Sequence, residues 1–465
     1  MKKVALFCIP AHGHTNPMLP VAAELVRRGN TVRFYSFNEF KSKIEAAGAE
    51  FVSCDFYLPE LTKKEEAGLK SVSTTEMTIQ DIHITLAMND FLRDEIQSFK
   101  PDVVYTDSVC FWGKLNAWKY DIPMVVSTST FAFNQLSSQY MKNSPRELAG
   151  LIFGLPRVSR ELNKLKAYGF QFKGLFSLIQ SDNDTDSVVY TSRHFQPYAE
   201  SFSDHYAFVG PSVFSKKEPN KKKDRPLVYI SLGTVINDRP DFYGKCIEAL
   251  KDMDADVIIS CGNAIDREVF GVLPKNVQVY PYVDQLDVLS KADVFITHCG
   301  MNSVSESLYM AAPMVLYPQT NEQKAVARRT MEIGAGIMLS DDSAQGIRSA
   351  VQNVLDSDSY RVSADECSKD FRSCSGTNGA AEFIENAPHS SNGIDLSKEL
   401  SKANGKFQCL YWGIAMVIII LVGVFISWKY VWIVGVPVGI LSTPIGKALQ
   451  KRQYKSLIEK MSRQK

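Results

Sequence analysis

The sequence has little that would specify a disulfide framework, a zinc site or a nucleic-acid partner. Its nine cysteines are odd in number and scattered, and no two of them form a CxxC pair. This spacing argues against paired cysteines and favours a reducing compartment. Lysine plus arginine number 52 against 51 for aspartate plus glutamate, a formal net charge of +1. So even a balance gives no electrostatic reason to expect nucleic acid as a partner.

The N-terminus lacks the features of a secretory signal. The apolar run after Lys3 spans only residues 4–11, contains Pro10 and is followed by His12. A signal peptide needs a longer apolar stretch and small residues at a cleavage site. We therefore expect residues 4–9 to form a buried strand and the folded domains to stay in the cytosol.

The chain is 465 residues long, with 45% hydrophobic and 22% charged residues, which is typical of a globular protein. Because one hydrophobic core rarely exceeds roughly 250–300 residues, two domains are expected. Apolar runs predict strands at 4–9, 31–35, 102–105, 124–127, 228–231, 256–260, 277–280, 294–297 and 314–317. Segments between them predict helices at 20–28, 38–47, 111–120, 243–251 and 303–310. Strands that alternate with helices predict the α/β class, with two Rossmann-like domains facing a cleft.

The C-terminal region has a different composition. Residues 409–428 and 430–446 carry no charge, and the first run is long enough for a hydrocarbon core of about 30 Å. Residues 447–465 are basic, with Glu459 as their only acid. We expect 409–446 to form a membrane hairpin, with the basic tail 447–465 on the cytosolic side near anionic lipid. A single crossing and a buried pair of core helices are the alternatives.

The predicted organisation has six parts. These are an N-terminal domain (1–212), a lysine-rich linker (213–225), a C-terminal domain (226–388), a polar linker (389–408), the membrane hairpin (409–446) and the basic tail (447–465).

The segment 297–306 places polar residues where a strand ends and a helix begins. Gly300 permits a close approach of the backbone, while Asn302 and Ser303 can cap the helix. Free N–H groups at a helix start attract an anion, and His298 adds a further donor. These features predict a phosphate site, although a purely structural helix cap fits them equally well.

Three further polar residues follow in positions suited to sugar hydroxyls. Glu306, one turn into the helix, can accept hydrogen bonds from a ribose. Glu322 and Gln323 follow the next strand and can hold the hydroxyls of a second sugar.

The whole stretch resembles the donor-binding signature of the family-1, UDP-glycosyltransferase-type enzymes, including their bacterial macrolide-glycosyltransferase branch. The matching positions are His298, Gly300, Asn302, Ser303, Glu306, Pro313, Pro318, Glu322 and Gln323. The resemblance implies a GT-B fold and a UDP-sugar donor, with no cofactor and no metal. It also implies that His298, Asn302 and Ser303 bind the diphosphate. Glu306 then binds the ribose, and Glu322 with Gln323 the transferred sugar.

Two other segments resemble donor-binding parts of the same family. In the segment 280–289, the resemblance implies that Tyr282 stacks on uracil, Val283 contacts its edge through the backbone and Gln285 completes the pocket. Asp284 stands where the family has proline. The segment 229–234 resembles the first strand of the donor domain. Its end would place Ser231, Gly233 and Thr234 toward the phosphates.

The loop after the first strand lacks the GxGxxG pattern of dinucleotide enzymes and carries two histidines instead. Histidine is the side chain best suited to accept a proton near neutral pH. The loop resembles the acceptor loop GHxxPxL of the family, and His14 matches its general base, whereas His12 has no counterpart. Asp107 ends another predicted strand and matches the aspartate that orients the base.

Together these features predict inverting transfer of a hexose, with glucose the first expectation, from a UDP-sugar to a hydroxyl of a small lipophilic acceptor. The expected location is a bacterial plasma membrane, with the catalytic domains in the cytoplasm and residues 409–465 in contact with lipid. A UDP-sugar epimerase or hydrolase on the same fold is one alternative. A membrane sensor of sugar nucleotides without catalysis is another.

Overall fold

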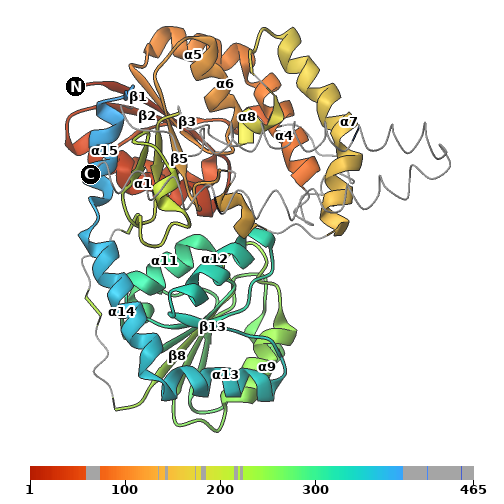
Figure 1. Cartoon of the computed structure of the whole chain (residues 1–465), viewed down its shortest axis with the longest axis vertical. Helices are drawn as coiled ribbons and strands as arrows, with labels where there is room; N and C mark the ends of the chain where they lie inside the picture. The colour runs from red at the N-terminus through yellow and green to blue at the C-terminus, as the bar shows by residue number, and fades with distance from the viewer. Residues whose placement is uncertain are drawn as a thin grey trace, which may run out of the picture.

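A computed structural model describes residues 1–58, 74–134, 136–141, 145–172, 174–179, 185–213, 218–219 and 224–390, together with residues 416 and 452. Two α/β domains are stacked along the long axis of the molecule (Figure 1). Each is built on a parallel sheet with helices packed against it, as the alternation of strands and helices predicts.

The N-terminal domain has a seven-stranded sheet of order β3-β2-β1-β4-β5-β6-β7. Its strands are β1 (Lys3–Phe7), β2 (Thr31–Ser36), β3 (Glu50–Ser53), β4 (Val103–Asp107), β5 (Met124–Thr128), β6 (Ser187–Val189) and β7 (Tyr206–Phe208). Its helices are α1 (His12–Arg27), α2 (Lys41–Ala46), α4 (Thr74–Ala87), α5 (Asn89–Phe99), α6 (Phe111–Lys119), α7 (Pro145–Ala167) and α8 (Leu175–Ile179). Short 3-10 turns include η1 (Asn38–Phe40) and η3 (Ser137–Tyr140).

The C-terminal domain has a six-stranded sheet of order β10-β9-β8-β11-β12-β13. Its strands are β8 (Leu227–Ser231), β9 (Asp256–Ser260), β10 (Val277–Tyr280), β11 (Val294–Thr297), β12 (Met314–Leu316) and β13 (Gly336–Met338). Its helices are α9 (Pro240–Leu250), α10 (Gln285–Lys291), α11 (Met301–Tyr309), α12 (Asn321–Glu332), α13 (Ala344–Asp356) and α14 (Asp358–Ser373).

Both sheets reverse their strand order beside the first strand, between β1 and β4 and between β8 and β11. Such a reversal leaves a crevice at the carboxyl ends of the two strands, where open α/β sheets bind ligands. The strands on either side of it are almost wholly buried, because helices cover both faces of the sheet. These two points on the sheets position the candidate site.

Helix α1 begins earlier than predicted. The sequence places its start at Pro20, because proline suits the first turn of a helix and disrupts an interior. In the structure the helix begins at His12 and includes both Pro17 and Pro20. Both prolines are buried, as are Met18 and other apolar residues on the same helix, so tertiary packing holds the prolines inside it. His14 consequently lies in the first helical turn and not in a loop.

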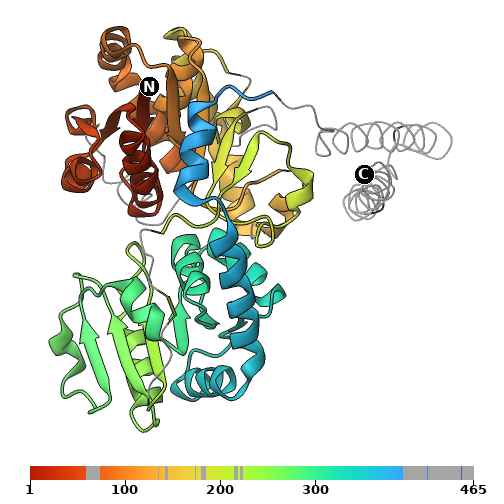
Figure 2. The same ribbon diagram turned by 90° about the vertical axis from the view of Figure 1, so that its left-hand side faces the viewer.

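The last described helix, α15 (Gly376–Glu385), returns to the N-terminal domain. It packs beside α1 at the left of the upper domain in Figure 1, on the side that faces the viewer in Figure 2. Arg28 of α1 pairs with Glu385 at 2.7 Å, and Ala381 and Ile384 join the core of the N-terminal domain. The strand–helix rhythm of residues 226–388 does not indicate this crossing.

The structure contradicts two predictions, the C-terminal transmembrane segments and the membrane-anchored location. No helix within the described residues has the length and apolar character needed to cross a membrane. The longest of them, α7, has 23 residues but carries charged side chains such as Arg157 and Glu161. Charged residues along one face are typical of an amphipathic helix that packs on a domain. The predicted hairpin at 409–446 lies outside the described residues.

Candidate active site

The structure brings His14 and Asp107 together at the strand reversal of the first sheet. Nδ1 of His14 lies 2.7 Å from Oδ2 of Asp107. The other carboxylate oxygen of Asp107 accepts a hydrogen bond from the N–H of Val109 at 3.0 Å. The Asp107 side chain is fully buried, whereas that of His14 is 28% exposed. One edge of the imidazole is therefore held, and the ring remains accessible.

Two residues near His14 have no part in the sequence-based site. The hydroxyl of Ser129 lies 3.2 Å from Nδ1 of His14. Ser129 follows β5, the next strand of the sheet, so the rule that ligands gather at strand ends could have found it. Asp81 on α4 is close enough for its charge to act on His14. No local signal marks Asp81, because it lies in mid-helix.

The surroundings of His14 favour its protonated form. Burial opposes the charge, but the Asp107 carboxylate, its hydrogen bond, and the charges of Glu322 and Asp81 together raise the pKa of His14 to about 9. Burial, reinforced by the charge of Asp107, raises the pKa of Asp81 well above its usual range. A base at His14 thus has high proton affinity and releases its proton only in alkaline solution.

His12, the second histidine of the motif, has a different partner. Its Nε2 lies 2.8 Å from Oε1 of Glu39 on η1, and its ring packs edge-on against Phe40. These contacts attach the start of α1 to η1 and account for His12 without a chemical role.

The predicted phosphate site lies at the start of α11. Gly300 is the N-cap residue, and no side chain in the described part of the chain caps this helix, so the expectation that Asn302 and Ser303 cap it is wrong. The two residues lie two and three positions after Gly300, inside the first turn. Because no side chain occupies the first N–H groups, they are available to an anion at the positive end of the helix dipole.

His298 is enclosed by two glycines. A Cβ atom at Gly233 would lie 2.5 Å from Cε1 of the His298 ring, and one at Gly300 would lie 2.5 Å from its Nε2. Burial lowers the pKa of His298 to about 4, although a backbone interaction with Ser231 opposes the shift. Its Nδ1 is buried and has no hydrogen-bond partner among the described residues. The ring is therefore neutral, and its position depends on the absence of side chains at both glycines.

The predicted ribose and uracil residues are joined by one amide. Nε2 of Gln285 donates to Oε2 of Glu306 at 2.6 Å and to the hydroxyl of Ser303 at 3.4 Å. The hydroxyl of Tyr229 donates to Oε1 of Gln285 at 3.1 Å. Burial raises the pKa of Glu306 to about 7, against the hydrogen bond from Gln285 and with the charge of Asp284.

The loop before α10 is stabilised although it lacks the family's proline. The carboxylate of Asp284 caps α10 by accepting from the N–H of Asp287 at 3.1 Å. This cap gives the loop a fixed end. Beside it, Tyr282 is 80% exposed, and Val283 is half-buried. An aromatic ring presented to solvent in this way can stack on a base.

At the end of β8 the predicted phosphate residues differ in exposure. Ser231 is buried, and its hydroxyl accepts from the N–H of Gly233 at 3.3 Å. Gly233 has a φ of 77°, a conformation that glycine adopts readily. Thr234, the next residue, is exposed.

The start of α12 carries the predicted sugar-binding pair. Thr320 is its N-cap, and Gln323 completes a capping box with it. Oε1 of Gln323 accepts from the N–H groups of Gln319 and Thr320 at 2.7 and 3.1 Å. Glu322 is exposed and acts electrostatically on His14. The capping box therefore fixes the Gln323 side chain at the helix start, and Glu322 lies exposed beside it.

A direct contact connects the two halves of the site. Nδ2 of Asn302 donates to the carbonyl of Gly13 at 3.0 Å, across 289 residues of sequence. Gly13 precedes His14, and Asn302 lies in the first turn of α11. The proposed base and the proposed phosphate helix therefore meet at one place on the domain interface.

Known proteins share these features of the sequence and the structure. Residues 217–370 match the family model of UDP-glucuronosyl and UDP-glucosyl transferases. An NDP-glycosyltransferase, YjiC, of Bacillus licheniformis is 34% identical over 396 residues, which are 83% of this chain and 97% of that protein. The chain belongs to the UDP-glycosyltransferase family.

Further relatives place this glycosyltransferase in the bacterial branch related to macrolide-modifying enzymes. The demethyllactenocin mycarosyltransferase of Streptomyces fradiae is 29% identical over 400 residues, covering 83% of this chain and 86% of that protein. The crystal structure of the calicheamicin glycosyltransferase CalG4 has a TM-score of 0.66 and 26% identity, covering 83% of this chain and 98% of that chain. The protein is a GT-B glycosyltransferase that uses a nucleotide-sugar donor.

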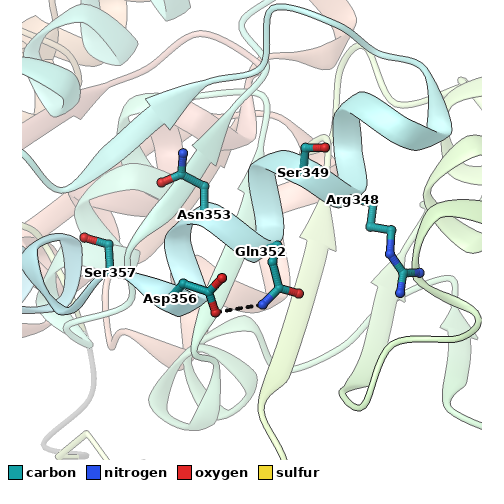
Figure 3. Close-up of a pocket in the computed structure, with 6 residues that line it drawn as sticks. All are labelled: Arg348, Ser349, Gln352, Asn353, Asp356 and Ser357. Carbon is teal, nitrogen blue, oxygen red and sulfur yellow. Dashed lines mark hydrogen bonds between the residues drawn. The ribbon is translucent and has the colours of Figure 1, made fainter.

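A pocket and the question of a metal site remain to be described. A pocket on α13, lined by Arg348, Ser349, Gln352, Asn353, Asp356 and Ser357, contains no predicted site residue (Figure 3). Within it, Gln352 donates to Asp356 at 2.7 Å. Across the part of the chain that the structure describes, no group of three His, Cys, Asp or Glu side chains is arranged to hold a metal.

Proposed function

We propose that the enzyme transfers a hexose, glucose in the first instance, from a UDP-sugar to a hydroxyl of a small apolar acceptor, with inversion at the anomeric carbon. The observation that carries the proposal is the 2.7 Å contact between His14 and Asp107, located where Asn302 of the donor helix reaches Gly13. A base and a phosphate-binding helix start at one interface are the two parts that such a displacement requires.

The reaction is a single displacement. Nε2 of His14 accepts the proton of the acceptor hydroxyl as that oxygen attacks the anomeric carbon from the face opposite the diphosphate. The bond from the anomeric carbon to the phosphate oxygen breaks, and UDP leaves with the electron pair. Asp107 stabilises the imidazolium that forms. The uncapped N–H groups of α11 and the neutral His298 stabilise the charge on departing UDP.

The choice of uridine rests on Glu306 and Tyr282. A carboxylate accepts hydrogen bonds from both ribose hydroxyls, and a deoxyribose donor offers only one of them. Tyr282, with its exposed ring, supplies a surface for stacking on the base. We therefore expect UDP to bind more tightly than dTDP.

The proposal that the acceptor is apolar is based on a side chain of helix α4. Met77 is 39% exposed and lies one turn before Asp81, so that both face the same side of the helix. Because Asp81 is electrostatically coupled to His14, we assign this apolar side chain to the acceptor side of the site. Phe111 and Phe131 are core residues and do not line an acceptor site. Relatives that are named for demethyllactenocin and calicheamicin also favour a small-molecule acceptor.

The test incubates the full-length protein with radiolabelled UDP-glucose and a panel of sterol-like, polyketide and lipid alcohols. We expect a β-glucoside and UDP only when an acceptor is present. Isomerised UDP-sugar or free glucose without an acceptor would refute the proposal in favour of an epimerase or hydrolase. UDP binding without turnover on any acceptor would favour the sensor.

Two histidine variants test the assignment of the base. His14→Ala should lower kcat by about 100-fold or more and leave the dissociation constant of UDP nearly unchanged. His12→Ala is the matched control, since His12 lies in the same turn but pairs with Glu39. Equal losses of kcat in both variants, or loss of UDP binding in His14→Ala, would refute the role of His14.

A further inference from the structure

Helix α1 contains a backbone carbonyl that its own helix cannot satisfy in the usual way. In an α-helix the carbonyl of Gly13 accepts from the N–H of residue 17. Residue 17 is proline, which has no N–H, and it is buried inside the helix. Gly13 is exposed, and a Cβ atom there would meet nothing within 4 Å. The carbonyl is thus left for a donor from outside α1.

Asn302 is that donor. Its Nδ2 lies 3.0 Å from the carbonyl oxygen of Gly13. An amide nitrogen carries two hydrogens, so one N–H can hold the carbonyl while the other points elsewhere. Asn302 lies in the first turn of α11, where the main-chain N–H groups have no side-chain cap. An anion bound at this turn would lie within reach of the second amide N–H.

We propose that Asn302 bridges the two domains, with one N–H on the Gly13 carbonyl and the other on the donor phosphate, and that Pro17 keeps this carbonyl open for it. The proposal rests on the proposed transfer reaction. A single planar amide between two oxygen atoms sets their separation. Because His14 follows Gly13 directly, the bridge sets the distance from the base to the anomeric carbon. Pro17 and Gly13 are positioning residues that act through Asn302.

The same turn is attached to the connection between the domains. The hydroxyl of Ser212 donates to the carbonyl of Pro17 at 2.7 Å. Ser212 lies immediately before the predicted linker, so the turn from Gly13 to Pro17 is attached to the linker as well as to the donor helix. The two contacts therefore lie on either side of His14 in the same turn.

The experiment is a double-mutant cycle on the full-length enzyme with Pro17→Ala and Asn302→Ala. Alanine at position 17 restores the N–H that can satisfy Gly13 within α1 and compete with Asn302. We expect Pro17→Ala to lower kcat roughly fivefold in the wild-type background, the effect of one hydrogen bond. It should leave kcat unchanged when Asn302 is already alanine. The dissociation constant of UDP should change little in the single Pro17→Ala variant, because no donor residue is altered.

Pro20→Ala is the matched control. Pro20 is also buried within α1, and its replacement restores an N–H toward the carbonyl of Asn16. Among the described residues, no hydrogen bond joins that carbonyl to the other domain. Pro20→Ala should therefore change kcat by the same small factor with or without Asn302. If Pro17→Ala lowers kcat equally in both backgrounds, or no more than Pro20→Ala does, the bridge is refuted.

The thermal unfolding midpoint, measured on the same variants, needs no turnover. The effects of Pro17→Ala and Asn302→Ala on the midpoint should be non-additive, since both act on one hydrogen bond. Non-additive effects on the midpoint, together with no transfer of hexose to any acceptor, would support the contact and refute the proposed transfer reaction. Additive midpoints would refute the bridge even in an active transferase.

Discussion

Nδ1 of His14 lies 2.7 Å from Oδ2 of Asp107, although 93 residues separate them in the sequence. Two neighbouring parallel strands create this contact, because His14 follows β1 and Asp107 ends β4. The buried carboxylate fixes one nitrogen of the ring. The electrostatic consequence is measurable, since a base held in this way should titrate far from the usual histidine range.

We expect kcat/KM to rise with pH until about pH 9 and then to level off. Burial opposes protonation of His14, but the charges around it, chiefly that of Asp107, raise its pKa to about 9. A general base must be neutral to accept a proton, so the active fraction increases as the pH rises through this value. A pH–rate profile of kcat/KM reports the free enzyme and measures this limb. An ascending limb whose midpoint lies near the ordinary histidine pKa of about 6.5 would contradict the expected effect of Asp107.

Asp107→Asn should move the same limb to lower pH and lower the plateau of kcat by about 100-fold or more. The charge that raises the pKa of His14 is lost, and so is the group that stabilises the imidazolium. Asp186→Asn is the matched control, because Asp186 holds His205 through a similar 2.6 Å contact outside the site. A limb that moves in the control, or stays in place in Asp107→Asn, would refute the coupling.

Glu306→Gln should remove a pH dependence from UDP binding. Burial raises the pKa of Glu306 to about 7, so the carboxylate becomes ionised and a better acceptor for ribose hydroxyls as the pH rises through that value. The ratio of wild-type to variant affinity for UDP, measured by calorimetry, should increase between about pH 6 and 8. Titration of the nucleotide itself cancels in this ratio. A ratio independent of pH would contradict the ribose assignment.

Gly300→Ala should weaken UDP binding about tenfold or more, because a hydrogen bond to a charged group contributes about 1.5–3 kcal/mol. The φ of Gly300 is −61°, so alanine is acceptable to the backbone, but its Cβ would meet the His298 ring at 2.5 Å. Gly244→Ala in α9 is the control, since a Cβ there meets nothing within 4 Å. Equal UDP affinities in two variants with normal unfolding midpoints would show that His298 does not bind the donor.

Several elements could be predicted to the residue, and others could not. Strands β9, β10 and β11 have the predicted bounds. β11 is buried throughout and is a continuous apolar run. β10 alternates buried and exposed residues, a period of two that is also visible in the sequence. Strands β6 and β7 have three residues each and are too short to produce such a run. The start of α1 was misplaced, because the penalty for Pro17 and Pro20 is local whereas the packing that offsets it involves distant residues.

The sequence alone determined which side chains are available for chemistry and at which strand ends they stand, since strand periodicity and motif spacing are properties of neighbouring residues. Only the tertiary structure decided which of them meet. The pairing of His12 with Glu39, the enclosure of His298 by Gly233 and Gly300, and the bond from Asn302 to Gly13 join segments that are distant in the chain. The first two contacts depend on how elements pack within one domain, and the third depends on how the two domains are placed relative to each other. No local sequence pattern contains that information.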